Sequence, residues 1–264
     1  MTNTLALARA EVMRLRRNKR YTIFTIILPV ALYLAIGGSV KGAHAYGIDY
    51  AAYYMIAMAS IGAFSGALTG NAQRIAQERK DGWVRQLRLT PLPANAYVVG
   101  KIVAAMAITV PSVVIVLLLG RFYGGVHLET WKWFAIFGAI WIGSLTFTAL
   151  AVAIGYRFLP DTVQPIAMVI YLIMSVLGGL WFALNGVMKD VGQYLHTYQI
   201  TRIGTDVIAG VSIPVSAFVI IAAWFAAFLA LRTGGKWSLC RAPSLITASP
   251  TCGRTTLPPL INAE

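Results

Sequence analysis

Residues 73–101 read QRIAQERKDGWVRQLRLTPLPANAYVVGK. It is dense in charge, with an unbroken run at Glu78–Asp81 and further arginines at Arg85 and Arg88. Long apolar segments flank it on both sides. Because charges of this density are costly to place in hydrocarbon, we expect the stretch to lie outside a membrane that its neighbours cross. The prolines of Thr90–Pro93 are expected to end its helix.

The composition also indicates a membrane protein. Hydrophobic residues make up 58% of the 264 residues, charged residues make up 12%, and the mean hydropathy is +0.70. Soluble domains are about 45–50% apolar and about 25% charged. The apolar runs reach the roughly 20 residues that a helix needs to cross a bilayer, and they do not alternate as barrel strands do. The predicted fold class is therefore an all-α integral membrane protein.

Six apolar runs are long enough to be spanning helices, and together they form a predicted transmembrane domain over residues 21–232. The expected spans are about 21–40, 50–71, 96–120, 131–155, 163–183 and 206–231. With a cytoplasmic N-terminus, 17 of the 22 Lys and Arg residues lie inside, and the five outside are Lys41, Arg121, Lys132, Lys189 and Arg202. This bias predicts that both termini and the 73–96 loop are cytoplasmic. It also accounts for the net charge of +13, so no nucleic-acid partner is expected.

Three further segments lie outside the predicted spans. Residues 1–20 have a helical apolar stripe among many basic residues, which predicts an amphipathic cytoplasmic interface helix; a plain charged segment is the alternative. Residues 185–205 predict an outer interfacial helix about three turns long, from a stripe formed by Val187, Val191, Tyr194 and Tyr198. Residues 233–264, rich in Ser, Thr, Pro and Gly, are expected to be a disordered cytoplasmic tail.

Small residues recur every four positions in the second predicted span, at Gly62, Gly66 and Gly70. This spacing lets two helix backbones approach closely. Two explanations of this spacing remain open: packing between helices within the chain, and a contact made by a central or mobile helix.

The residues that carry catalysis or ligand chemistry are missing from the sequence. There is no G-x-x-x-x-G-K-[ST] motif, so the chain is not expected to cradle nucleotide phosphates itself. His44, His127 and His196 fall in separate predicted outer segments, and Cys240 and Cys252 fit no metal-binding spacing. The predicted spans also hold no carboxylate at mid-depth, which argues against ion coupling. We therefore expect no catalytic residue, no metal and no bound cofactor.

The charged stretch resembles the cytoplasmic loop of ABC-2 type transporter permeases. In that family a Glu-Arg pair, a glycine, an L-x-x-T-P-L element and a Gly-Lys pair follow one another between the second and third spans. The matching residues here are Glu78, Arg79, Gly82, Leu87, Thr90, Pro91, Leu92, Gly100 and Lys101. The predicted interface helix, six spans and outer helix extend the resemblance over about residues 1–232. The chain departs from the family at Thr197–Gln199, where a proline usually precedes the last span.

The resemblance implies a permease subunit of an ABC exporter. Such a subunit pairs with a second permease chain, identical or not, lies in lipid, and docks a separate ABC ATP-binding subunit that carries ATP and Mg. The implied ATPase-coupling interface comprises Glu78, Arg79, Asp81, Gly82, Trp83, Arg85, Leu87, Thr90 and Pro91. Trp83 has an alternative place in the lipid headgroups. Lys101 is expected to be only a charge at the membrane boundary.

The resemblance also implies where the chain packs or transports. Because spans one, two and five often line the path or the dimer contact in this family, the residues expected there are Gly62, Gly66, Gly70, Ser175, Gly178 and Gly179. The few polar side chains on such a path favour a hydrophobic or amphipathic substrate, such as a drug, antibiotic or lipid, exported across the plasma membrane. Two other functions remain open: a membrane anchor or assembly factor that recruits a cytoplasmic partner, and an ion-coupled carrier.

Overall fold

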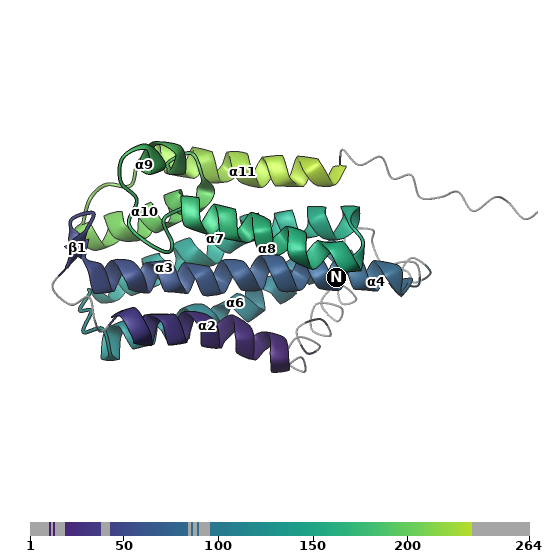
Figure 1. Cartoon of the computed structure of the whole chain (residues 1–264), viewed down its shortest axis with the longest axis horizontal. Helices are drawn as coiled ribbons and strands as arrows, with labels where there is room; N and C mark the ends of the chain where they lie inside the picture. The colour runs from purple at the N-terminus through teal and green to yellow at the C-terminus, as the bar shows by residue number, and fades with distance from the viewer. Residues whose placement is uncertain are drawn as a thin grey trace, which may run out of the picture. The chain divides into compact units, whose positions relative to one another are not determined.

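A computed structural model of the chain describes residues 11, 13, 19–37, 43–83, 86, 89 and 96–233, and these are mostly helical (Figure 1). The helices are α2 (Lys19–Gly37), α3 (Tyr50–Ser65), the π-helix η1 (Gly66–Gly70), α4 (Asn71–Lys80), α6 (Ala96–Phe122), α7 (Thr130–Arg157), α8 (Pro160–Leu177), α9 (Val187–Gly192), α10 (His196–Ala209) and α11 (Val215–Thr233). The two-residue strands β1 (His44–Ala45) and β2 (Ile48–Asp49) form a small antiparallel hairpin before α3. The predicted all-α class is confirmed.

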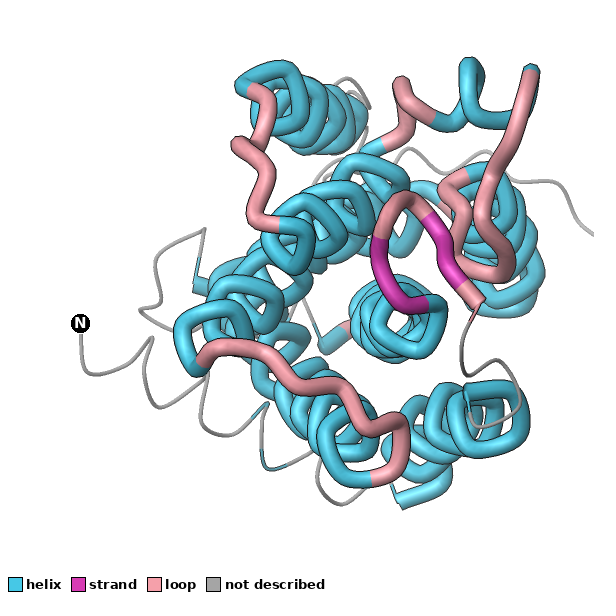
Figure 2. The backbone as a smooth tube through the Cα atoms, turned by 90° about the vertical axis from the view of Figure 1, so that its left-hand side faces the viewer, coloured by secondary structure: helices cyan, strands magenta, loops and turns pink. Residues whose placement is uncertain are grey.

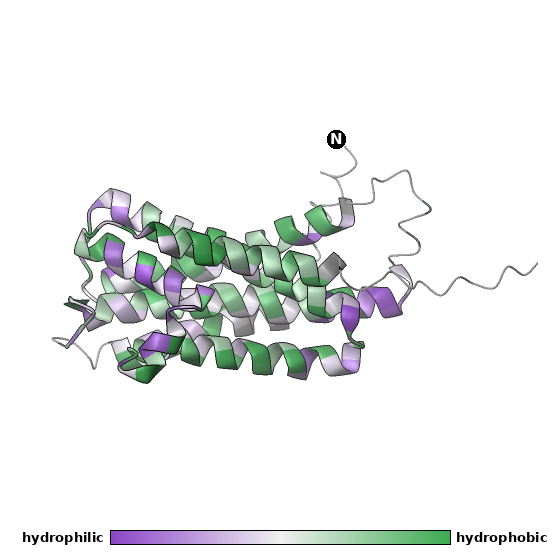
Figure 3. Ribbon diagram, turned by 90° about the horizontal axis from the view of Figure 1, so that it is seen from above, coloured by the Kyte–Doolittle hydropathy of each residue, from purple (hydrophilic) through white to green (hydrophobic). Residues whose placement is uncertain are grey.

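Within the described residues, four helices are long and apolar enough to cross a membrane. They are Tyr50–Lys80, Tyr97–Phe122, Thr130–Arg157 and Pro160–Leu177. Two shorter apolar helices, Thr25–Gly37 and Val215–Leu231, lie where the first and sixth spans were predicted. Figure 3 shows hydrophobic residues along the helices and hydrophilic residues towards their ends, most clearly at α4. The chain is therefore a helical membrane protein.

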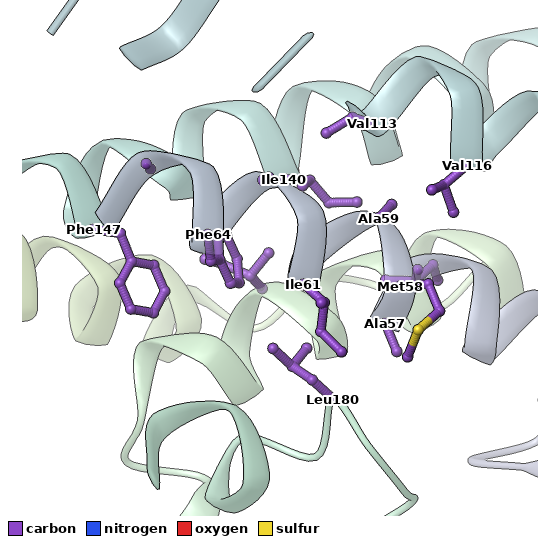
Figure 4. Close-up of a cluster of buried hydrophobic side chains, with 14 of the residues drawn as sticks. Ala57, Met58, Ala59, Ile61, Phe64, Val113, Val116, Ile140, Phe147 and Leu180 are labelled. Atoms are coloured by element: carbon purple, nitrogen blue, oxygen red, sulfur yellow. The ribbon is translucent and has the colours of Figure 1, made fainter. Parts of the chain in front are cut away.

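Helix α3 lies at the centre of the bundle, with the other long helices around it (Figure 2). Its side chains are mostly alanines, aromatic residues and long aliphatic residues, and all of them from Ala51 to Phe64 are buried. Helices α3 and α6 approach each other closely at Gly120 of α6, where an added Cβ would lie 2.0 Å from the sulfur of Met55. The Phe64 ring meets the Phe147 ring of α7 at 4.8 Å between centroids, within the apolar cluster of Figure 4.

The first part of the predicted 73–96 coupling loop is helical, as expected from the sequence, and it is partly buried. Helices α3, η1 and α4 follow one another without a break from Tyr50 to Lys80. The apolar residues of α4 explain why: Ile75 and Ala76 are fully buried. An added Cβ at Gly155 of α7 would lie 2.8 Å from the Cβ of Ile75, so this glycine lets the two helices come close.

The outer segment forms two helices, so the prediction of one interfacial helix over 185–205 is wrong. Helix α9 ends at Gly192, where an added Cβ would lie 2.6 Å from the Leu177 carbonyl oxygen, and α10 begins at His196. The predicted apolar stripe is divided as a result, because Val187 is 78% exposed whereas Tyr198 is 8% exposed.

Helix α11 begins later than the predicted start of the sixth span. Asp206 belongs to α10, which ends at Gly210 in the left-handed conformation, with φ of 73°. Helix α11 starts at Val215, directly after Pro214. A left-handed glycine is a common helix end, so α10 stops at Gly210 although the hydropathy is continuous from 206 onwards.

His196 is buried, although the sequence placed it in an outer loop. It is the first residue of α10, it is 0% exposed, and its ring lies 4.6 Å from the Phe147 ring and 6.3 Å from the Phe228 ring. Neither ring nitrogen has a hydrogen-bond partner among the described residues. Burial lowers the pKa of His196 to about 3, so the side chain is neutral at physiological pH.

Two of the predicted segments lie largely or wholly outside the described residues. Of the predicted interface helix 1–20, the structure describes the side chains of Glu11 and Met13 only. The predicted tail 233–264 is described only as far as Thr233.

Candidate functional site

A buried ion pair joins α4 to α6 at the charged end of the bundle. The Nζ atom of Lys101 lies 2.6 Å from Oε1 of Glu78, and the hydroxyl of Tyr97 donates to Oε2 of the same carboxylate at 2.7 Å. Lys101 and Tyr97 are four residues apart on α6, so both face α4. Lys101 is 1% exposed, which makes this contact part of the interior and not a surface ion pair.

Glu11, from the N-terminal segment, completes this group of charges. Its Oε2 atom lies 2.8 Å from Nζ of Lys101 and 3.5 Å from Nη2 of Arg74 on α4. We call Glu11, Arg74, Glu78, Tyr97 and Lys101 the charged cluster. Two carboxylates and two cations balance in charge, and the structure brings them together from three separate parts of the chain.

The arginine beside Glu78 joins α4 to the turn between α7 and α8. Nη2 of Arg79 donates to the carbonyl oxygen of Phe158 at 2.9 Å. Phe158 is the C-cap residue of α7. A cation at this position satisfies a carbonyl beyond the last helical turn and interacts favourably with the helix dipole. Helix α4 therefore contacts the N-terminal segment, α6 and the α7–α8 turn.

A left-handed glycine ends α4. Asp81 is the C-cap residue, and its carboxylate accepts from the side chain of Gln77 at 2.9 Å. Gly82 follows with φ of +75°, a conformation that glycine adopts without steric cost. Trp83 comes next and is partly buried. The chain therefore changes direction at Gly82, immediately after the residues that form the cluster.

The rest of the predicted coupling interface falls on residues whose placement is not described. These are Arg85, Leu87, Thr90 and Pro91. Their role in ATPase coupling stays a prediction. So does that of Glu78, Arg79, Asp81, Gly82 and Trp83, although the structure now gives these five a defined position at and after the end of α4.

The glycines of the second span face neighbours within the chain. An added Cβ at Gly62 would lie 2.1 Å from Oγ of Ser112 on α6 and 3.1 Å from Pro29 on α2. Gly66 and Gly70 are buried in η1. A π-helix turns less per residue than an α-helix, so the spacing of four no longer gives one straight stripe. This geometry favours packing within the chain over a contact between chains at Gly62.

Ser175, Gly178 and Gly179 lie at the opposite end of the bundle, where α8 ends. An added Cβ at Gly178 would lie 2.1 Å from Oγ1 of Thr197, so this glycine allows close contact with α10. Gly179 has φ of +73°, and its carbonyl accepts from the hydroxyl of Tyr53. Ser175 is buried and accepts from the indole of Trp181 at 3.0 Å.

Lys101 is a buried ion-pair partner and not only a boundary charge, and Glu11 and Tyr97 were not predicted as its neighbours. A usable signal was present, because Lys101 is a single cation in the first turns of an otherwise apolar helix. A charge at such a position needs a carboxylate partner. Glu78 was already part of the same motif.

No group of three or more His, Cys, Asp or Glu side chains within the described residues could hold a metal ion. The charged cluster mixes both signs, and each of its carboxylates already contacts a cation. Its arrangement suits mechanical connection between helices better than proton transfer to a substrate.

Comparison with known proteins points to one family. The sequence model of the family described as ABC-2 type transporter matches residues 2–211. The chain is also similar to a protein of Bacillus subtilis (strain 168) named "Putative transport permease YvfS". The two are 27% identical over 227 residues, which cover 84% of this chain and 92% of the relative.

Proposed function

The chain belongs to the ABC-2 type transporter family, and on that premise we propose that it is the permease subunit of an ATP-driven exporter. A separate ABC ATP-binding subunit, carrying ATP and Mg, binds the chain at the end of α4 and the segment after it. The observation that carries this proposal is the continuity of the helix from Tyr50 to Lys80. The same helix lies at the centre of the transmembrane bundle and reaches the charged cluster.

The contacts of α4 support transmission of movement from the ATPase. A force applied near Gly82 acts on a helix that is about 45 Å long, at 1.5 Å per residue. Glu78 contacts α6 and Arg79 contacts the α7–α8 turn. A displacement of α4 therefore acts on α3 directly and on α6, α7 and α8 through these polar contacts.

The proposed topology has six spans in the plasma membrane with both termini in the cytoplasm. Two helices supplement the four long ones: α2 and α11, each of 19 residues, which is close to the length that a bilayer requires. Most basic residues then lie inside. A second permease chain, identical or different, completes the pathway, and the apolar bundle favours a hydrophobic or amphipathic substrate such as a drug, antibiotic or lipid.

The test of this function is whether an ATPase binds the chain through the segment after α4. We expect the full chain, purified in mild detergent from its native membrane, to bring with it an ATPase that has a G-x-x-x-x-G-K-[ST] motif. Trp83→Ala and Gly82→Pro should reduce ATPase recovery and ATP-dependent transport, while the amount of permease in the membrane stays unchanged. Arg121→Gln, which removes an exposed charge at the other end of the bundle, is the matched control.

Two results would overturn the proposal. One is transport by the purified chain without any ATPase. The other is full ATP-dependent transport after residues 74–88 are replaced by a neutral linker of equal length.

A further inference from the structure

A cavity of about 280 Å³ lies at the end of the bundle opposite the charged cluster. It is enclosed by the residues before and in the first turn of α3, by the end of α8, and by α9 and α10. The side chains that define its chemistry are Tyr46, Tyr53, Tyr198, Lys189, Arg202 and Asp206. Small-molecule sites begin at about 300 Å³, so this space suits a group of one or two rings. We call it the tyrosine cavity.

Hydrogen bonds to the backbone fix two of the tyrosines at the cavity wall. The hydroxyl of Tyr46 donates to the carbonyl of Leu184 at 3.0 Å and accepts from its N–H at 2.7 Å. The hydroxyl of Tyr53 donates to the carbonyl of Gly179. The two rings lie 5.5 Å apart at 60° to each other. Tyr53 is fully buried and supports Tyr46 from behind. The ring of Tyr46 is partly exposed and, because its hydroxyl is already bonded, forms an ordered surface for an apolar or aromatic group.

The charges around the tyrosine cavity are mainly positive. Lys189 lies 5.8 Å above the ring of Tyr46 and takes part in none of the ion pairs found among the described residues. Nε of Arg202 lies 3.6 Å from Oδ2 of Asp206, so one cation is paired and the other is not. Burial raises the pKa of Tyr198, and the nearby positive charge of Arg202 acts in the opposite direction. The net charge of the lining favours an anion.

We propose that the tyrosine cavity is a binding site for an amphipathic anion. Its ring or other apolar part lies against Tyr46 and Tyr198, and its anionic group faces Lys189 and Arg202. An amphipathic cation of the same size would meet repulsion from both basic side chains, with Asp206 alone to attract it and already paired.

The position of the cavity suggests a use for this site. In the proposed topology it lies on the outer side of the membrane, where an exported molecule leaves the bundle. This use as a substrate site on the exit side rests on the proposed function, whereas anion binding itself does not. The two can therefore be tested separately.

Three ring compounds of similar size and different charge test the binding site. The full chain is placed in nanodiscs of phosphatidylcholine without any ATPase, and dissociation constants are measured for 1-naphthalenesulfonate, 1-naphthalenemethanol and 1-naphthylmethylammonium. We expect the sulfonate to bind about fivefold more tightly than the neutral compound, because a partly exposed ion pair adds about that much affinity. The ammonium compound should bind most weakly.

Variants then locate the binding. Lys189→Gln and Arg202→Gln should each weaken sulfonate binding about twofold, so that the two losses together come close to the fivefold preference for the anion. Gln193→Trp should abolish it, because the indole fills the cavity that Gln193 lines without removing a charge. Arg121→Gln removes a basic residue at the same end of the bundle but outside the cavity, so it should leave binding unchanged.

Equal binding of the three compounds, or equal binding by the four variants, would show partition into lipid and overturn the proposal. Preference for the ammonium compound would overturn it as well, because Asp206 would then dominate the site. Since no ATPase is present, loss of ATPase co-purification and loss of sulfonate binding are separate results. Binding that persists while transport of anionic compounds is absent would retain the site and reject its use in export.

Discussion

Replacing Lys101 by methionine tests whether the charged cluster holds α4 in place. Methionine keeps most of the side-chain length and removes the charge that faces Glu11 at 2.8 Å and Glu78 at 2.6 Å. These carboxylates have side chains only 3% and 13% exposed, so water compensates little. Removing one partner of a buried ion pair costs about 3–5 kcal/mol. For a chain of this size, each kcal/mol lowers the melting temperature by about 2–4 °C, so we expect a decrease of about 6–20 °C.

The assay is thermal unfolding in mild detergent, followed by tryptophan fluorescence, for which the chain supplies seven tryptophans. Arg121→Gln serves as the control and should shift the midpoint by less than about 2 °C, since it removes an exposed charge. Adding Glu11→Gln and Glu78→Gln to Lys101→Met should restore much of the loss, because the two buried carboxylates that Lys101 neutralises are then no longer charged. A single variant as stable as the control, or a triple variant no better than the single one, would refute the reasoning.

Three other substitutions test the local geometry. Gly82→Ala should lower the unfolding free energy by about 1 kcal/mol, because alanine is strained at φ of +75°; a calorimetric melt that shows no loss would contradict this. Gly62→Leu should cost about 1–3 kcal/mol by crowding Ser112, measured as denaturant sensitivity, with no change expected in subunit stoichiometry if the contact is internal. Because of His196, the protein should become less stable as pH falls below about 6.5, and the loss should be about 2 kcal/mol between pH 7 and pH 5. In this range His196 binds a proton in the unfolded state but not in the folded state, where its pKa is about 3. The melting temperature of His196→Phe should lack this decrease, and an identical pH profile in both proteins would reject the burial argument.

The parts of the fold that depend on local sequence could be predicted. Helix α7 was expected over about 131–155 and spans Thr130–Arg157, and the third span was expected over about 96–120 and spans Ala96–Phe122. Hydropathy gives such elements because every residue in them contributes to the same preference for lipid or for the core. The order of residues from Glu78 to Lys101 was likewise enough to identify the family, which the comparison with known proteins confirmed.

The parts that depend on long-range contacts could not be predicted. Lys101 looks like a boundary charge in the linear sequence, and its burial becomes apparent only when Glu11, 90 residues earlier, lies beside it. His196 looks like a loop residue until rings from α3, α7 and α11 surround it. The break between α9 and α10 follows from close packing at Gly192, whereas the local periodicity continues through it. In each case tertiary packing outweighs the local pattern.

The helix of the second span ends further along the chain than the change in amino-acid composition predicts. The second span was predicted to stop at about Asn71, before the charged stretch, yet the helix continues through η1 and α4 to Lys80. Side chains there satisfy the backbone: Oγ1 of Thr69 donates to the Ser65 carbonyl at 2.7 Å, and Nδ2 of Asn71 donates to the Ala67 carbonyl at 3.0 Å. These bonds satisfy carbonyls where the hydrogen-bond register changes, so the π-helix does not interrupt the rod. Because the central helix and α4 are joined in this way, ATPase binding after α4 and movement of the bundle core are coupled by one continuous element in the proposed mechanism.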